Sequence, residues 1–105
     1  MLEEIESIMR RNDAVQILQE QSEALMDSYP ISALFLFGSV ARDEAREDSD
    51  VDILVEFSQP IGLFQLIALK EDLETLLGRR VDIGTQRSLK PQVKGRVLQE
   101  AIRIF

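Results

Sequence analysis

The sequence predicts an α/β fold (α+β) in which a small mixed β-sheet is flanked by helices. Three short apolar runs, residues 31–37, 51–57 and 80–85, are bounded by turn residues and are too short for core helices, which is typical of buried strands. Longer segments with apolar side chains at helical spacing lie before, between and after these runs. This alternation predicts a sheet with helices packed against it.

The first predicted helix covers residues 2–28. Its apolar side chains follow helical spacing, and at Asn12-Asp13 the helix could break and be capped again. Tyr29-Pro30 ends it, because proline cannot continue a helix. Directly after the first strand, residues 40–46 are also compatible with a short helix.

An amphipathic helix is predicted over residues 62–78, with Gly78 as its C-terminal cap. The side chains that can share its broad apolar face are Phe64, Ile67, Leu69, Leu73, Leu76 and Leu77. A final helix is predicted from residue 88 to about 101, with Pro91 tolerated in its first turn. Residues 101–105 alternate in polarity, so they could form strand or helix.

Length and composition exclude several classes of protein. The chain has 105 residues, near the commonest size of one domain, so we expect a single domain over residues 1–105. Its hydrophobic content of 45% argues against disorder. The absence of Cys and His removes disulfides, thiol nucleophiles, imidazole-dependent triads and the usual zinc sites. Any catalysis must therefore use carboxylates, hydroxyls, cations and hard metal ions.

The charge is acidic overall and unevenly distributed. The formal net charge is −7, and residues 1–60 carry 4 basic and 14 acidic side chains, whereas residues 61–105 carry 8 and 5. We expect no direct nucleic-acid partner, because non-specific affinity for nucleic acid comes from Lys and Arg. The basic last third could face a polyphosphate or an acidic partner, or be a solvated mixed surface.

The sequence gives no sign of a membrane segment. No apolar run approaches the ~18 residues of a membrane helix. The acidic start MLEEIESIMRR also differs from a secretory signal, which is basic and then apolar. We therefore expect a cytoplasmic protein with no membrane partner.

The pair Gly38-Ser39 follows directly on a predicted buried strand and precedes a helix-compatible segment. Glycine lets a phosphate approach the backbone closely, and a helix N-terminus offers unpaired N–H groups to it. The Ser39 hydroxyl adds one donor. Taken alone, this pair favours an ordinary turn with a helix cap over a phosphate site.

Asp50 and Asp52 lie two residues apart where the second strand begins, so both side chains point to the same face. Asp52 stands among apolar residues, where an isolated carboxylate would be costly and must be paired, hydrogen-bonded or metal-bound. Without His or Cys, the metal would be a hard ion such as Mg²⁺ bound together with substrate phosphates. The alternative is a solvated strand entrance. A calcium loop starting at Asp48 is excluded, because Ile53 and Gln59 stand where that loop needs Gly and Glu.

Asp82 lies in the third short strand. If that strand neighbours residues 51–57, the Asp82 carboxylate could become a third metal ligand or a general base. The alternative is an ion pair with Arg79 or Arg80.

Together these residues form the pattern Gly38-Ser39, ten residues, Asp50-x-Asp52 and a later strand Asp. This resembles the DNA polymerase β-type nucleotidyltransferase superfamily. The segments GSVARDEAREDSDVDILVEF, IGLFQLIALKEDLETLLGRRVDI and SLKPQVKGRVLQEAIR are similar to the minimal nucleotidyltransferases that are paired with HEPN-domain toxins in prokaryotic toxin–antitoxin modules. The resemblance covers residues 13–105 and implies a polymerase β-like nucleotidyltransferase fold.

The resemblance implies transfer of AMP from ATP, with Mg²⁺, to a tyrosine hydroxyl of a cognate HEPN toxin. Gly38 and Ser39 would hold the triphosphate, Asp50 and Asp52 would bind Mg²⁺, and Asp82 would join the metal site or help to activate the acceptor hydroxyl. Arg42 matches a frequent Arg of the family and would contact phosphate. Lys90 resembles a frequent basic position of the family. For both residues, the alternative is an ordinary exposed side chain.

Two positions depart from the family pattern. Asp43 stands where relatives often have Gly, and Gly84 stands where an apolar residue is commoner.

Two other functions stay open: an antitoxin that occludes its toxin without catalysis, and a transferase for small-molecule hydroxyls. The latter is disfavoured, because 105 residues leave no room for an acceptor-binding domain.

Overall fold

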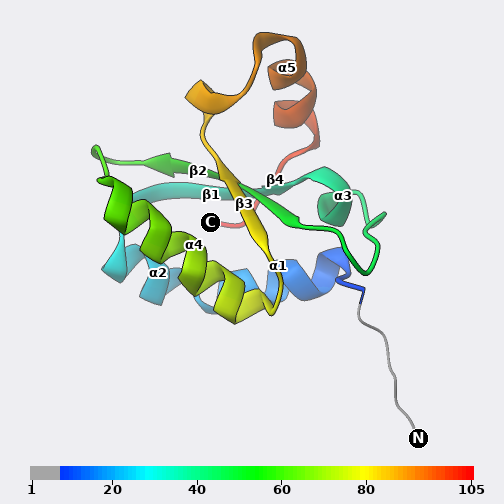
Figure 1. The fold of residues 1–105 in the computed structure, drawn as a ribbon, viewed down its shortest axis with the longest axis horizontal. Coiled ribbons are helices and arrows are strands. Elements are labelled where there is room, and N and C mark those ends of the chain that lie inside the picture. Colours follow the sequence, from blue (N-terminus) through cyan, green and yellow to red (C-terminus); the bar gives the residue numbers. More distant parts are fainter. Residues whose placement is uncertain (1–7) are drawn as a thin grey trace, which may run out of the picture.

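A computed structural model describes residues 8–105. Within them, a four-stranded sheet of strand order β3-β2-β1-β4 carries helices on both faces (Figure 1). In chain order the elements are α1 (Arg11–Glu20), α2 (Ser22–Ser28), β1 (Ile31–Phe37), α3 (Gly38–Ala41), β2 (Val51–Phe57), α4 (Leu63–Leu77), β3 (Val81–Gly84), the 3-10 turn η1 (Gln86–Ser88), α5 (Pro91–Glu100) and β4 (Ile102–Arg103).

The sheet is mixed. β1 pairs antiparallel with both β2 and β4, whereas β2 and β3 run parallel and are connected through α4. Figure 1 shows α1, α2 and α4 on one face of the sheet and α5 on the opposite face. The predicted class, a small mixed sheet flanked by helices, is therefore confirmed.

The core fills the space between the sheet and α1, α2 and α4. Alternate residues of β1 and β2 point into it, because successive side chains of a strand face opposite sides. Fully buried members of this cluster include Leu18, Leu34, Leu36, Ile53, Val55, Leu69 and Leu73. The intervening residues of β2 face the other side, where Glu56 accepts a hydrogen bond from Gln86 of η1 at 2.8 Å.

Most predicted elements are confirmed. β1 and β2 have the predicted bounds. The last residue of α4 is Leu77, and Gly78 caps the helix with a φ of +67°, the left-handed conformation typical of a glycine cap. The last residues of the chain form a strand, since residues 102–103 pair with β1. The final helix begins at Pro91 instead of residue 88, because residues 86–88 form η1, which Thr85 caps through Ser88.

The predicted helix 2–28 is wrong in its bounds and in its break. Residues 1–7 lie outside the described residues, α1 begins only at Arg11, and the chain breaks at Gln21 instead of Asn12-Asp13. Gln21 has φ −101° and ψ 8°, which lies outside the usual helical conformation. Buried Leu25 of α2 and Leu18 of α1 still belong to the same core, because residues seven apart share a helix face.

The predicted apolar face of α4 is wrong at its start. Leu69, Leu73 and Leu77 are buried and Leu76 packs against them, but Phe64 is 86% exposed and Ile67 is 44% exposed. At 3.6 residues per turn, Phe64 lies about 180° from the middle of the stripe formed by Leu69, Leu73 and Leu77. Phe64 therefore points away from the sheet.

No helix among residues 8–105 has both the length and the apolar character needed to span a membrane.

This packing makes a prediction about stability. Leu73→Ala should lower the free energy of unfolding by about 2–5 kcal/mol, because it leaves a cavity in the core. Phe64→Ala should change it by less than about 0.5 kcal/mol, because the ring is exposed. Urea denaturation of both variants measures the contrast, and an equal loss in the two would contradict this orientation of α4.

Candidate active site

The three predicted acids lie at the same end of the β2–β3 pair, where two of them are neighbours. Asp52 is the second residue of β2, and Asp82, the second residue of β3, is its partner in the parallel register. Residues paired in this way place their side chains on the same face of a sheet. Asp50 stands one residue before β2. The predicted neighbourhood of Asp82 and the strand 51–57 is thus present.

Gly38 packs directly against this acid cluster. The last residue of β1, Phe37, is the antiparallel partner of Asp52, so Gly38 comes next to that carboxylate. A Cβ on Gly38 would overlap the Asp52 carboxylate, and φ of +76° is itself a conformation that favours glycine. The glycine that the sequence suggested for close approach of a phosphate therefore makes room first for Asp52. Ser39 follows in α3, which is a single turn of helix.

The acids influence one another electrostatically. Burial, and after it the charges of Asp82 and Asp50, raise the pKa of Asp52 to about 6, while the charge of Arg42 opposes this shift. Asp52 is half-buried, and within residues 8–105 no N–H or O–H group donates a hydrogen bond to its carboxylate. Oxygen donors with such an excess of negative charge suit a hard divalent cation, so this donor set fits Mg²⁺.

Asp50 has a different partner in this structure. Its Oδ1 lies 3.3 Å from Nε of Arg80, and both side chains are largely exposed. The ion pair considered for Asp82 therefore forms at Asp50 instead, and Arg79 donates to the backbone carbonyl of Glu47 at 2.9 Å. In the described part of the chain, no three acidic, His or Cys side chains converge closely enough to hold a metal ion. To join Asp52 and Asp82 around a cation, Asp50 would have to leave Arg80.

Arg42 lies beside the cluster but is engaged by two carboxylates. Its Nε contacts Glu44 at 3.0 Å, and its Nη1 contacts Glu100 of α5 at 3.0 Å. Lys90 is exposed at the start of α5. No sequence pattern indicated a role for Glu100 or for Arg96, which also contacts Glu100. Both residues reach the site only because α5 folds back over the sheet.

The two departures from the family pattern are accommodated. Asp43 adopts φ +61°, the conformation a glycine would take, and its Oδ1 accepts a hydrogen bond from the Arg11 N–H at 2.9 Å. The turn after Arg42 is therefore kept. Gly84 continues β3 as the partner of Leu54, so the strand geometry at Asp82 is intact.

The charge cluster predicts a pH-dependent effect of Asp52→Asn. The pKa of Asp52 is higher in the folded state than in the unfolded chain, so ionisation destabilises the fold as the pH rises through about 4 to 6. Above this range the variant should be more stable than wild type by about 1 kcal/mol, with solvent screening of this half-exposed group allowed for. Below it the difference should vanish. Melting temperatures at about pH 8 and about pH 4 test this, and a less stable variant at the higher pH would indicate a structural ion pair instead.

The chain is similar in sequence to known proteins. Residues 18–104 match the family model described as the nucleotidyltransferase domain. The protein adenylyltransferase MntA of Thermococcus cleftensis is 42% identical over 103 residues, which cover 98% of this chain and 95% of that protein.

Solved structures agree with the fold. A candidate minimal nucleotidyltransferase superposes with a TM-score of 0.65 at 44% identity, covering 84% of this chain and 93% of the other. A chain from the complex of tri-AMPylated Shewanella oneidensis HEPN toxin with MNT antitoxin superposes with a TM-score of 0.63 at 22% identity, covering 87% and 71%, which supports the fold alone. Since the family model spans most of its length, the chain belongs to the nucleotidyltransferase domain family.

Proposed function

We propose that this chain is a protein adenylyltransferase that transfers AMP from ATP to a hydroxyl of a partner protein. The observation that carries the proposal is the meeting of Gly38 and Asp52, with Asp82 as the register partner of Asp52. It is supported by the 42% identity to a protein adenylyltransferase over almost the whole chain.

Each residue has a role in this proposal. The turn at Gly38-Ser39 binds the triphosphate through its backbone and the Ser39 hydroxyl. Asp50 and Asp52, with Asp82, hold Mg²⁺, which when bound neutralises charge on the phosphates and orients them for in-line displacement. Asp82, exposed at the start of β3, accepts the proton of the attacking hydroxyl. That oxygen bonds to the α-phosphorus of ATP, and pyrophosphate leaves.

The acceptor belongs to another molecule. The chain contains a single tyrosine, Tyr29, which is 8% exposed. Its hydroxyl donates to Asp72 Oδ2 at 2.6 Å, and burial together with that contact raises the pKa of Tyr29 to about 12. A neutral, buried phenol is a poor nucleophile, so a tyrosine acceptor must come from a partner.

For the partner we propose a HEPN-domain toxin, which this chain silences as its antitoxin. The support is the fold shared with a chain from the complex of a tri-AMPylated HEPN toxin and an MNT antitoxin. The competing function is an antitoxin that binds and occludes its toxin without catalysis.

The first test separates catalysis from occlusion. Wild-type chain at one-tenth of the concentration of a HEPN-domain protein encoded beside it, with ATP and Mg²⁺, should add AMP to most molecules of that protein. Asp50→Asn/Asp52→Asn should bind the partner yet lose several orders of magnitude in transfer, because each ~1.4 kcal/mol of lost transition-state stabilisation is tenfold. Intact-mass spectrometry and a toxicity rescue assay measure both.

The matched control is Glu23→Gln/Asp27→Asn, which removes two exposed charges of α2 and should transfer AMP like wild type. No added mass, together with equal rescue by the Asp50→Asn/Asp52→Asn variant, would leave occlusion as the function.

The second test concerns Tyr29. Incubated alone with ATP and Mg²⁺, the chain should carry no AMP on Tyr29, because the phenol is buried and bonded to Asp72. Peptide mapping by mass spectrometry gives the result. Modified Tyr29 would show that the acceptor can be supplied by the chain itself.

A further inference from the structure

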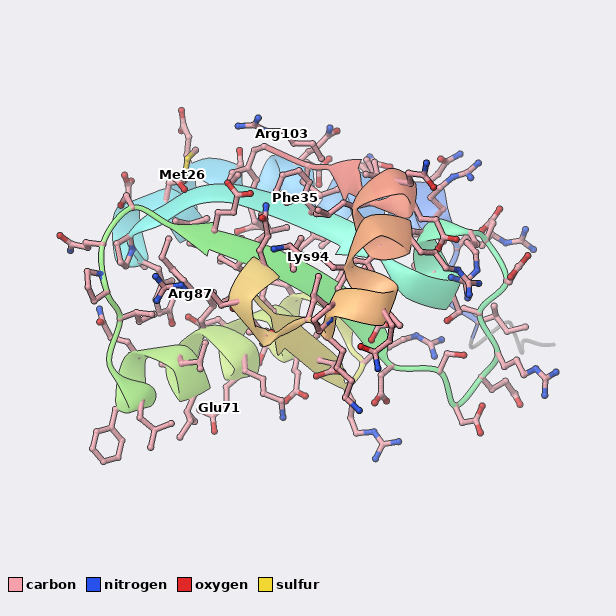
Figure 2. All side chains as sticks on the ribbon, turned by 90° about the horizontal axis from the view of Figure 1, so that it is seen from above. Met26, Phe35, Glu71, Arg87, Lys94 and Arg103 are labelled. Carbon is pink, nitrogen blue, oxygen red and sulfur yellow. The ribbon has the colours of Figure 1, made fainter. Side chains whose placement is uncertain are left out.

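The helix α5 has little buried surface and is joined to the end of α3 by the ion pair between Arg42 and Glu100. None of its residues is fully buried, and Val93 and Leu98 are 41% and 40% exposed. Seen from above, α5 and η1 lie in front of the sheet, with Lys94 over the sheet between them (Figure 2). Helices with little buried surface move at low cost in free energy. The contacts of Glu100 at the end of α5 therefore help to hold the helix in this position.

Glu100, at that end, joins two guanidinium groups. Its Oε1 contacts Nη1 of Arg42 at 3.0 Å, and its Oε2 contacts Nε of Arg96 at 3.2 Å. Both contacts lower the pKa of the Glu100 carboxyl, with Arg96 contributing more than Arg42. Two arginines that converge on the two oxygens of one planar anion form a site for oxyanions in general.

This pair of arginines borders a pocket that reaches the glycine turn. The pocket has a volume of about 220 Å³ and lies between α5 and the end of β1. Its walls are formed by Phe37, Gly38, Arg42, Val93, Arg96, Val97 and Glu100. An anion held by Arg42 and Arg96 would thus lie in a pocket that also contains Gly38, which packs against Asp52.

We propose that Arg42 and Arg96 form a diphosphate-binding site that Glu100 occupies in the free protein and that the terminal phosphates of a nucleoside triphosphate take over. The diphosphate group of the triphosphate and free pyrophosphate share this chemistry. A phosphate carries more charge than a carboxylate and is matched bidentately by guanidinium groups. The assignment to a nucleotide rests on the proposed function, whereas the anion site itself does not.

The site has a consequence for α5. When phosphate replaces the carboxylate, Glu100 loses its partners, and α5 loses its charged contact with Arg42. Arg96 belongs to α5, so it would then hold the helix to the ligand instead of to the protein. Ligand binding and the position of α5 are therefore coupled.

The test compares Glu100→Gln with wild type by isothermal titration of pyrophosphate, of a non-hydrolysable ATP analogue and of AMP, all with Mg²⁺. Removal of the competing carboxylate should tighten binding of pyrophosphate and of the analogue by about 3- to 10-fold, the range of one or two partly exposed ion pairs. AMP lacks the terminal phosphates, so its affinity should stay within about twofold. Glu20→Gln makes the same change in net charge on α1 and should behave as wild type.

A second variant removes one arginine. Arg96→Gln should weaken pyrophosphate and the analogue by about 2- to 5-fold and leave AMP unchanged; its side chain is exposed, so it tests the site even if Glu100→Gln does not fold. Unchanged or weaker pyrophosphate binding by folded Glu100→Gln, or an unchanged affinity in Arg96→Gln, would overturn the proposal.

The two proposals fail separately. If the analogue does not bind wild type while Glu100→Gln binds pyrophosphate more tightly, the anion site stands and the proposed nucleotide function fails. If AMP is transferred to the partner while both variants bind pyrophosphate like wild type, the proposed function stands and this site is refuted.

Discussion

The contact between Gly38 and Asp52 determines how the rest of the site is built. Phe37 and Asp52 are partners in the β1–β2 register, so the residue after Phe37 meets the carboxylate. A side chain there would displace Asp52. A slip of one residue in this register would turn Asp52 into the leucine-rich core and Ile53 out of it. Gly38 and Asp52 therefore depend on each other, although Gly38 begins α3, Asp52 lies in β2 and a loop separates these elements.

The sheet has two faces with opposite demands, and this explains where the charge is placed. The face toward α1, α2 and α4 is fully apolar and supplies the hydrophobic stabilisation. The other face carries Asp52 next to Asp82, which costs free energy because burial and repulsion both oppose ionisation. A charge arrangement that weakens the fold and gathers oxygen donors is expected of a site selected for function.

Sequence patterns predicted those parts of the structure that depend on neighbours along the chain. β1 and β2 were predicted with their observed bounds, because each apolar run is closed by a turn, and Gly78 ended α4 because a left-handed cap favours glycine. Asp82 was predicted to join the acids of the second strand if the two strands were neighbours, and the register of β2 and β3 brings Asp52 and Asp82 together.

The errors have a common physical cause, since they concern contacts between distant segments. The break at Gln21 is not marked by a proline or glycine, and Arg80 is brought to Asp50 by the parallel pairing of β2 and β3. Neither has a local signal. The exposure of Phe64 has a different cause, because helical geometry alone places it opposite the buried stripe. The sequence was therefore sufficient to exclude Phe64, and the predicted apolar face included too many residues.

The uneven distribution of charge along the sequence corresponds to an uneven distribution of charge in the folded structure. The basic last third, residues 61–105, includes η1, α5 and β4 besides α4 and β3, and α5 lies over the face of the sheet that carries the acids (Figure 1). Carboxylates alone would repel a polyphosphate, and a cation between them reverses that effect only locally. Basic side chains on an element above the acids supply attraction on the other side of such a ligand. Acids on the sheet with basic side chains on α5 above them are the arrangement that the proposed binding of Mg²⁺ and a triphosphate requires, and a uniformly acidic surface would not provide it.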